Sequence, residues 1–437
     1  MKRKGKLLLV SYYWPPSGGP GVQRWLKLVK YLVRLGWQVT VYTPTNPESG
    51  AYDPSLLNDV PDTVHIIQRP IFEPLSFYHR LTGKKNGIGV GLLNKKSSKK
   101  GILHRLLLWV RANLFIPDAR CFWVHPSVRY LRQLLRNDPH DVVITTGPPH
   151  SMHLIGLGLQ RKTNMRWVAD FRDPWVNIDY HQHLPLNKRS RKKHIALERS
   201  VVENADAVSI VAEGMKDDFT SYQAKRIVTI FNGFDAEDFR GNTTVEDTRL
   251  FRLVYAGSMN ADRNPHQLWH VLQGLKQTGY ISPATFRVEL VGVCDAQVTE
   301  SIRQAEIEDL VQLRGSVAHE EVASLLCGAS MLLLCVNRAP TSRAILTGKL
   351  FEYLASGRPI LAIAPRDGEA AALLARTQCG QAFEEGDTEA LLQYLKQSLL
   401  LHQEKRLQVE ASSELALYSR AYQAKQFSDL FETLLQI

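Results

Sequence analysis

A lysine and a glutamate stand near the start of an expected helix in the segment Gly348-Lys-Leu-Phe-Glu-Tyr-Leu-Ala-Ser-Gly-Arg-Pro-Ile-Leu361. The pattern predicts a helix that carries Lys349 and Glu352 in its first turn, stops at Gly357 and leads into a buried strand. An ammonium group and a helix N-terminus both favour phosphate, and a carboxylate accepts hydrogen bonds from ribose hydroxyls. These residue types at this spacing therefore suit a nucleoside diphosphate.

A second segment suited to an anion lies near the start of the chain. Ser17-Gly18-Gly19-Pro20-Gly21 follows an expected strand and precedes an expected helix, where glycines let a ligand approach the backbone. The spacing is not G-x-G-x-x-G, and the next strand ends in Val41-Tyr-Thr-Pro44 without an acid for a ribose hydroxyl. A nicotinamide or flavin cofactor is therefore not expected. The alternative is a tight turn that serves only the chain geometry.

Two polar blocks follow expected strands in the same half of the chain, Thr145-Thr-Gly-Pro-Pro-His-Ser151 and Trp167-Val-Ala-Asp-Phe-Arg-Asp-Pro-Trp175. Charged groups beside aromatic rings suit a carbohydrate. The candidates for binding such a carbohydrate are His150, Asp170, Arg172 and Asp173. The alternatives are a structural ion pair between Asp170 and Arg172, and an N-cap-like turn at His150.

The elements that must position these residues alternate between strand and helix. Apolar runs predict strands at 6–12, 38–42, 64–68, 141–145, 166–170, 207–211, 227–231, 251–256, 286–291, 311–314, 331–336 and 359–363. Helical spacing over 22–35 places a helix between the first two strands, and similar units recur. Such units form parallel sheets, whose ligands lie beyond the carboxyl ends of the strands.

Length and composition predict a globular chain of two or three domains. The chain has 437 residues, of which 44% are hydrophobic and 22% charged, which excludes a disordered or fibrous protein. No apolar run approaches the ~18 residues of a membrane span, and the first one is too short for a secretory signal. Five scattered cysteines without a C-x-x-C pair fit reduced thiols. We therefore expect a cytoplasmic protein.

The formal net charge of +11 is concentrated in the first half of the chain. No acid occurs between Glu73 and Asp118, and a second basic cluster spans 188–193. The expected helix 102–115 is amphipathic and carries Trp109, so we predict that the basic insertion 80–116 faces an anionic membrane surface. The alternative is a core helix behind a solvated loop. Nucleic acid is not expected, because the basic residues lack the aromatic platforms that bind single strands.

The segment that ends at Leu361 resembles the donor-site helix of retaining glycosyltransferases of family four, which have the GT-B fold. The resemblance extends over nearly the whole chain. Phe231-Asn-Gly-Phe-Asp235 is similar to the family's inter-domain Asn-Gly-x-Asp element, and Tyr255-Ala-Gly-Ser-Met-Asn-Ala-Asp-Arg263 to its diphosphate loop. Gly315-Ser-Val317 resembles its Gly-x-Val segment. The final segment resembles its crossover helix.

The resemblance implies an α/β GT-B protein with two Rossmann-like parallel-sheet domains facing a cleft. Residues 1–235 would bind the acceptor, 236–411 the nucleotide-sugar, and 412–437 would form a helix that packs back on the N-terminal domain. The implied donor-binding residues are Gly18, Gly19, Gly257, Ser258, Arg263, Lys349, Leu350 and Glu352. The implied catalytic residues are Arg263, Lys349, His150 and Asp173.

The implied activity is transfer of a hexosyl or related sugar to a hydroxyl with retention of configuration. A basic N-terminal domain indicates a lipid-linked glycan or glycolipid acceptor at the inner face of the cytoplasmic membrane, in the biosynthesis of an envelope polysaccharide. The family needs no divalent metal, and no Asp-x-Asp metal motif stands at a strand end, so neither metal nor cofactor is expected.

Three positions depart from the family pattern. The family has two glutamates separated by seven residues, and Ala344 stands where the first would be. Ser258 also stands where an arginine is usual, and Arg263 where a lysine is usual. These departures leave open a catalytically degenerate nucleotide-binding protein. A nucleotide-sugar epimerase of the same fold is a further alternative.

Overall fold

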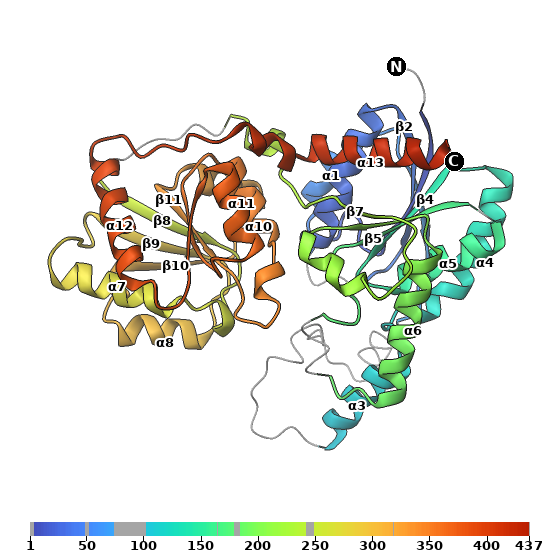
Figure 1. Cartoon of the computed structure of the whole chain (residues 1–437), viewed down its shortest axis with the longest axis horizontal. Coiled ribbons are helices and arrows are strands. Elements are labelled where there is room, and N and C mark those ends of the chain that lie inside the picture. Colours follow the sequence, from blue (N-terminus) through green and yellow to red (C-terminus); the bar gives the residue numbers. More distant parts are fainter. Residues whose placement is uncertain are drawn as a thin grey trace. The chain divides into compact units, whose positions relative to one another are not determined.

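The computed structural model describes residues 4–48, 52–73, 102–163, 165–178, 184–241, 249–317 and 319–436. The chain divides into two compact units (Figure 1). Unit 1 comprises Met1–Phe231 together with Gln423–Ile437, and unit 2 comprises Asn232–Tyr422. The sequence-based boundaries were at 235 and 411, so unit 2 starts earlier and runs further than expected.

Unit 1 contains a parallel sheet in the strand order β3-β2-β1-β4-β5-β6-β7. Its strands are β1 (Gly5–Val10), β2 (Trp37–Pro44), β3 (His65–Arg69), β4 (Val142–Gly147), β5 (Arg166–Phe171), β6 (Ala207–Ile210) and β7 (Ile227–Thr229). Its helices are α1 (Pro20–Arg34), α3 (Ile102–Leu114), α4 (Cys121–Asn137), α5 (Ser151–Thr163), α6 (Lys188–Asn204) and α13 (Arg420–Leu435), with 3-10 helices at Pro54–Asp59 and Glu213–Phe219. The central strands are continuous apolar runs because both faces of the sheet are covered.

Unit 2 contains a second parallel sheet in the order β10-β9-β8-β11-β12-β13. Its strands are β8 (Phe251–Ala256), β9 (Phe286–Val291), β10 (Val311–Gly315), β11 (Met331–Cys335), β12 (Ile360–Ile363) and β13 (Gly380–Phe383). Its helices are α7 (His266–Gln277), α8 (Ala296–Gln304), α9 (His319–Cys327), α10 (Gly348–Ala355), α11 (Glu369–Thr377) and α12 (Thr388–Gln403). Its 3-10 helices are Ala236–Phe239, Ala261–Arg263, Glu308–Leu310, Ser342–Ala344 and Ser413–Tyr418.

The prediction of two parallel α/β domains is confirmed. Two details differ from the expected elements. Strand β13 was not predicted, because Gly-Gln-Ala-Phe is neither apolar nor alternating and the strand pairs only with β12 at the sheet edge. The final helix starts at Arg420 rather than 412, since Ser413–Tyr418 forms a separate 3-10 helix before it.

Strand order reverses once in each sheet, between β1 and β4 in unit 1 and between β8 and β11 in unit 2. The crossovers on the two sides of such a point lead to opposite faces of the sheet and leave a crevice at the carboxyl ends of the strands. The Gly-rich loop follows β1, and the loop that carries Arg263 follows β8. Both predicted anion sites therefore lie at topological switch points.

Helix α13 belongs to the core of unit 1 although it is the last helix of the chain. The Phe427 ring lies 5.1 Å from that of Trp25, and the Phe431 ring lies 5.3 Å from that of Trp37. Lys4 forms an ion pair with Glu432 at 2.6 Å. These contacts show why the apolar spacing of the final segment requires a partner in the first half of the chain.

The predicted basic insertion is described only from Ile102 onward, as α3 and the residues that follow it. The lysines and arginine of 80–100 lie outside the described residues. Among the described residues, no helix has both the length and the apolarity needed to span a bilayer.

Candidate active site

Two cationic side chains meet at the switch point of unit 2. Lys349 lies in the first turn of α10, and its Nζ donates a hydrogen bond of 2.7 Å to the Tyr255 hydroxyl. Arg263, in the turn after β8, donates through Nε to Asn337 Oδ1 at 2.6 Å and through Nη1 to the Ser258 carbonyl at 3.2 Å. The sequence-based pairing of Lys349 with Arg263 is therefore consistent with the geometry of this edge.

Charge and burial make this position favourable for an anion. Burial, together with the nearby Arg263 charge, lowers the pKa of Lys349 to about 8, against the opposing effects of Cys335 and Glu352. Two positive groups held close together in a partly dehydrated position repel one another. A bound diphosphate would remove that repulsion and restore the ordinary pKa of Lys349.

Gly257 is required by the side chain of Lys349. Its φ is +118°, and a Cβ at this position would collide with Cε and Nζ of Lys349. The Gly257 amide donates to the Val291 carbonyl at 2.6 Å, which ties the loop to β9. The lysine stem therefore crosses directly over the backbone of the loop.

The remaining predicted donor-binding residues of unit 2 divide into two kinds. Two of them are accessible: Glu352 is half-buried and Ser258 is exposed. Leu350 is fully buried, and its amide donates to the Thr347 carbonyl at 3.1 Å, so neither its side chain nor its amide faces a ligand. The predicted role of Leu350 is therefore corrected to packing. Tyr353, one turn from Lys349, anchors α10 to β8 through the Ala256 amide at 2.8 Å.

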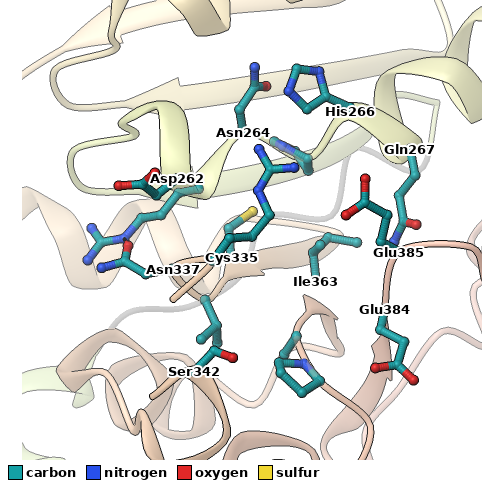
Figure 2. Close-up of a pocket in the computed structure, with 16 residues that line it drawn as sticks. Asp262, Asn264, His266, Gln267, Cys335, Asn337, Ser342, Ile363, Glu384 and Glu385 are labelled. Atoms are coloured by element: carbon teal, nitrogen blue, oxygen red, sulfur yellow. Dashed lines mark hydrogen bonds between the residues drawn. The ribbon is translucent and has the colours of Figure 1, made fainter. Parts of the chain in front are cut away.

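A pocket of about 230 Å³ lies beside Arg263 at the carboxyl ends of β8, β11, β12 and β13 (Figure 2). Its lining includes Arg263, Gln267, Asn337, Ile363, Glu384 and Glu385. The sequence indicated Arg263 alone among them, because the other groups come from α7, the loop after β11, the end of β12 and the loop after β13. Only the strand order brings these segments together.

The Gly-rich loop of unit 1 lies beside a guanidinium group. Gly19 has a φ of +97° and precedes the first turn of α1. A Cβ at Gly21 would stand 2.6 Å from Nη1 of Arg172, so the arginine lies against the loop backbone. Arg172 also donates to the Gly147 carbonyl at 3.2 Å and to the Pro148 carbonyl. A helix N-terminus and a guanidinium group together favour an anion here.

The predicted acceptor-binding residues Arg172 and Asp173 remain candidates. Burial lowers the pKa of Arg172, while the charges of Asp173 and Asp170 oppose the shift. The Asp173 side chain is exposed. The two side chains therefore stand at the carboxyl edge of β5, where a ligand can reach at least the carboxylate.

Asp170 is not available to a ligand. It is 0% exposed, and its carboxylate accepts hydrogen bonds from Arg24 Nη2 at 2.9 Å and Trp25 Nε1 at 2.7 Å. Thr146 and Ser209 donate to it as well, at 2.9 and 2.8 Å. Burial would raise its pKa, but the Arg24 charge and these hydrogen bonds outweigh burial and lower it. Asp170 therefore has a structural role, but the ion pair expected with Arg172 is wrong, since its partner is Arg24.

His150 is also buried, with 3% of its surface exposed. Its ring stacks on Trp175 at 5.0 Å, and a Cβ on Gly147 would lie 3.0 Å from its Nδ1. The N-terminus of α5 is capped by Asp118, which accepts hydrogen bonds from the Ser151 amide and hydroxyl. His150 therefore packs beneath the loop, and its burial does not favour the predicted catalytic role. It stands in the turn directly before α5, where its carbonyl accepts from the His153 amide at 3.0 Å, as the N-cap-like alternative expects.

One charged cluster was not foreseen. Tyr12 donates a hydrogen bond to Glu73, and Arg120 donates to the Tyr12 hydroxyl at 3.1 Å. Arg120 also lies 3.3 Å from Glu73 and 3.5 Å from Glu48. Each of Tyr12, Glu48 and Glu73 follows a strand end, but no spacing links them in sequence. Only the strand order β3-β2-β1 brings them together.

Basic and apolar side chains are exposed together on α3 and α6. Asn113 joins the two helices, since Nδ2 donates to the Pro185 carbonyl and Oδ1 accepts from the Asn187 amide, both at 2.9 Å. The α3–α6 surface comprises the exposed side chains of Arg105, Leu106, Trp109, Leu114, Lys188, Arg189, Arg191, Lys192 and Lys193. An alternative in which α3 is a core helix does not fit these exposures.

Solved structures share this fold over almost the whole chain. They include sucrose-phosphate synthase from Thermosynechococcus elongatus, with 16% identity, 99% of each chain covered and a TM-score of 0.60. WaaG, a glycosyltransferase involved in lipopolysaccharide biosynthesis, has 15% identity, 98% of this chain and 97% of that chain covered, and a TM-score of 0.53. A TarM mutant from S. aureus in complex with UDP has 11% identity, coverage of 98% and 99%, and a TM-score of 0.58.

Sequence comparison gives the family. A search of curated proteins found no match. A family model described as Glycosyltransferase Family 4 matches residues 21–238, and one described as Glycosyl transferases group 1 matches residues 251–400. Both units are thus matched in chain order, each with its own sheet. The chain belongs to glycosyltransferase family 4 and is a glycosyltransferase with two Rossmann-like domains of the GT-B type.

Proposed function

We propose that this glycosyltransferase uses a nucleotide-sugar donor, which unit 2 binds by its diphosphate. The observation that carries the proposal is the meeting of Lys349 and Arg263 at the switch point of the sheet, next to the N-terminus of α10. Glu352 lies three residues after Lys349 on α10, and we propose that its carboxylate accepts hydrogen bonds from the ribose hydroxyls. The TarM mutant, which has a similar fold, was solved in complex with UDP, and this supports a nucleotide ligand.

In the proposed reaction the bond between the sugar and the diphosphate breaks, and a bond from the sugar to the acceptor oxygen forms. Negative charge develops on the leaving diphosphate, and Lys349 and Arg263 stabilise that charge in the transition state. One proton is released from the acceptor hydroxyl per transfer. We propose retention of configuration and no metal requirement, on the family resemblance alone.

We propose a lipid-linked glycan or glycolipid as the acceptor, at the inner face of the cytoplasmic membrane. The support is the α3–α6 surface, where Trp109 and Leu106 are exposed beside the basic residues of α6. Each Lys or Arg near an anionic bilayer contributes about 1 kcal/mol. WaaG, with a similar fold, acts in lipopolysaccharide biosynthesis, which supports an envelope polysaccharide as the product.

A thermal-shift screen with UDP-, GDP-, ADP- and CMP-sugars tests the donor assignment. A ligand that binds only the folded protein raises the midpoint of unfolding, by an amount set by its concentration and Kd. We expect one nucleotide class to raise the Tm of the wild type and to lose this effect in Lys349→Ala. If no nucleotide-sugar shifts the Tm at millimolar concentration, the donor assignment is wrong.

Ala344 favours one alternative, a nucleotide-binding protein without turnover. Ala344 closes the 3-10 helix Ser342–Ala344, where the family pattern has an acid. Such a protein would bind the nucleotide-sugar and release no nucleoside diphosphate with any membrane-derived acceptor. A coupled assay for release of nucleoside diphosphate, with a total lipid extract as the acceptor, distinguishes this non-catalytic protein from an active transferase.

A further inference from the structure

The loop after β5 carries two of the candidate acceptor-binding residues but has no regular structure of its own. Arg172 and Asp173 stand at its start, and residues 172–178 form neither helix nor strand. The Arg172 amide donates to the Gly147 carbonyl at 3.0 Å, which fixes the first residue of the loop. Because the segment lacks a ladder of backbone hydrogen bonds, side chains must hold the rest of it.

Trp175 anchors the loop through its ring. The ring is fully buried and stacks on that of His150, with 5.0 Å between the ring centres and 7° between the planes. The indole Nε1 donates to Nδ1 of His194, on α6, at 3.0 Å. An indole N–H can only donate, so Nδ1 of His194 is the acceptor and carries no proton. His194, itself buried, thus holds the loop from the side of α6.

Glu198 lies about one helical turn after His194 on α6 and holds the backbone of the same loop. Its Oε1 accepts a hydrogen bond from the Val176 amide at 3.1 Å, and its Oε2 accepts one from the Tyr222 hydroxyl at 2.8 Å. Residues four apart share one face of a helix, and both His194 and Glu198 are buried. Two adjacent residues of the loop are therefore bound by two side chains of one helix face.

The burial of Glu198 destabilises unit 1. Glu198 is 2% exposed, and burial raises its pKa to about 6 against the hydrogen bonds from Tyr222 and Val176. These partners are a phenol and a backbone amide rather than a basic side chain. A carboxylate buried in this way is less favourable than an apolar side chain of similar volume. An apolar side chain could not accept from the loop, however, so the contact with the loop explains why an acid stands here.

We propose that His194 and Glu198 are positioning residues for glycosyl transfer, which hold the loop after β5 in the shape that receives the acceptor. Both act through Arg172 and Asp173, which stand at the carboxyl edge of β5. Arg172 also lies against the Gly-rich loop, since a Cβ at Gly21 would stand 2.6 Å from its Nη1, so a displaced loop would change two parts of the site at once. The inference rests on the proposed function, because it needs an acceptor that binds at this edge of unit 1.

Releasing the loop should weaken acceptor binding more than it slows the transfer itself. When only a fraction of the molecules holds the competent shape, the apparent affinity for a ligand falls by that fraction. Glu198→Leu and His194→Leu each leave a buried donor of the loop unsatisfied, so we expect each to raise the half-saturating concentration of acceptor about tenfold. The rate at saturating acceptor should stay within about twofold of the wild type.

Two conservative variants should restore the wild-type behaviour. Glu198→Gln keeps a carbonyl oxygen for the Val176 amide, and His194→Asn supplies an oxygen acceptor in place of Nδ1 for the indole of Trp175. For both, the half-saturating concentration should stay within about twofold of the wild type. Loss with leucine and rescue with these variants separates a hydrogen-bonding role from packing alone.

The assay follows release of nucleoside diphosphate at increasing concentrations of a total lipid extract, with the nucleotide-sugar that most raises the Tm of the wild type. Glu203→Leu makes the same change further along α6, where Glu203 pairs with Arg199, and is the matched control. Amide hydrogen exchange across 172–178 supplies a readout that needs no acceptor. Exchange there should be at least about tenfold faster in Glu198→Leu than in Glu198→Gln, while β1 and β4 keep the wild-type rates.

Each outcome decides for or against the inference. Unchanged half-saturation in both leucine variants would overturn it and leave the proposed function standing, since transfer still takes place. Equal losses in Glu198→Leu and Glu203→Leu, or no rescue by the two conservative variants, would overturn it as well. If Glu198→Leu does not fold, His194→Leu and the conservative variants decide. If the wild type releases no diphosphate with any nucleotide-sugar, the proposed function fails and the inference fails with it.

Discussion

The ammonium group of Lys349 lies 4.1 Å from the centre of the Tyr255 ring and donates a hydrogen bond to the hydroxyl of that ring at 2.7 Å. The contact holds a cation in place over the Gly257 backbone through a neutral partner. Burial raises the pKa of Tyr255, so the phenol stays protonated and does not neutralise the positive charge of the lysine. The ammonium is therefore preorganised to meet an anion.

Replacing either cation should impair transfer. Lys349→Ala and Arg263→Ala each remove a group that stabilises charge on the leaving diphosphate, so we expect a loss of about 10²–10³-fold in transfer rate, or ~3–4 kcal/mol. Release of nucleoside diphosphate by purified variants measures the loss. Rates within threefold of the wild type would exclude both residues from the chemistry. Arg303→Ala, on the exposed face of α8, is the matched control.

The charge of Lys349 should destabilise the ligand-free protein. Its pKa is about 8 when folded and higher when unfolded, so the unfolded chain binds more protons between these values and stability rises with pH across that window. Lys349→Met removes the cost and should raise Tm relative to wild type at pH 7, by a margin that shrinks towards pH 10. Exposed Lys162→Met serves as the control, and a pH-independent margin would contradict this account.

The buried pair of Arg24 and Asp170 should matter for stability. Asp170→Asn keeps the shape of the side chain but leaves the Arg24 guanidinium without a charged partner in the core, which costs about 3–5 kcal/mol. Exposed Asp173→Asn, on the same strand end, should change stability little. Denaturant unfolding compares the two, and similar midpoints for both variants would refute the structural role of Asp170.

The cluster around Tyr12 should make unit 1 sensitive to pH. Burial, together with a hydrogen bond and charge repulsion from Glu73, raises the pKa of Glu48 to about 7 despite the charges of Arg120 and Arg111. The folded protein then binds more protons than the unfolded chain between about pH 4.5 and 7, so stability is lost as pH rises through that window. Glu48→Gln mimics the protonated form and should flatten the profile. Thermal melts from pH 5 to 8 check this, and an unchanged slope would count against it.

The α3–α6 surface should bind anionic bilayers. Arg189→Gln/Lys192→Gln/Lys193→Gln removes three exposed charges, each of which contributes ~1 kcal/mol near an anionic surface. Binding to phosphatidylglycerol vesicles, measured by flotation, should therefore weaken at least about tenfold. Phosphatidylcholine vesicles should bind neither protein. Arg303→Gln/Lys405→Gln/Arg406→Gln makes the same charge change in unit 2 and should bind like the wild type. Equal losses in both triple variants would indicate a nonspecific charge effect.

Much of the fold could be predicted because its signals are local. Each buried parallel strand is a short apolar run, and the run Leu7–Val10 is typical. The edge strand Gly380–Phe383 carries no such run, and its place follows only from pairing with β12. Helical spacing over 22–35 likewise predicted α1 to within a few residues.

The site was less predictable because its partners are distant in the chain. Lys349 and Arg263 could be named from local motifs, but Tyr255 and Asn337, which hold them, could not. Asp170 was assigned to the ligand because its neighbour in sequence is Arg172, whereas its true partner is Arg24 on α1. Sequence proximity is a poor guide to which charges pair across a sheet.

The placement of α13 has a consequence for how the protein folds during synthesis. Unit 2 is continuous in sequence, whereas the core of unit 1 is completed by Phe427 and Phe431 near the end of the chain. Phe427 and Phe431 are synthesised after the whole of unit 2, so the sheet of unit 1 lacks their apolar contacts until then. The unit whose sheet is translated first thus receives part of its apolar cover only after the whole of unit 2 has been synthesised.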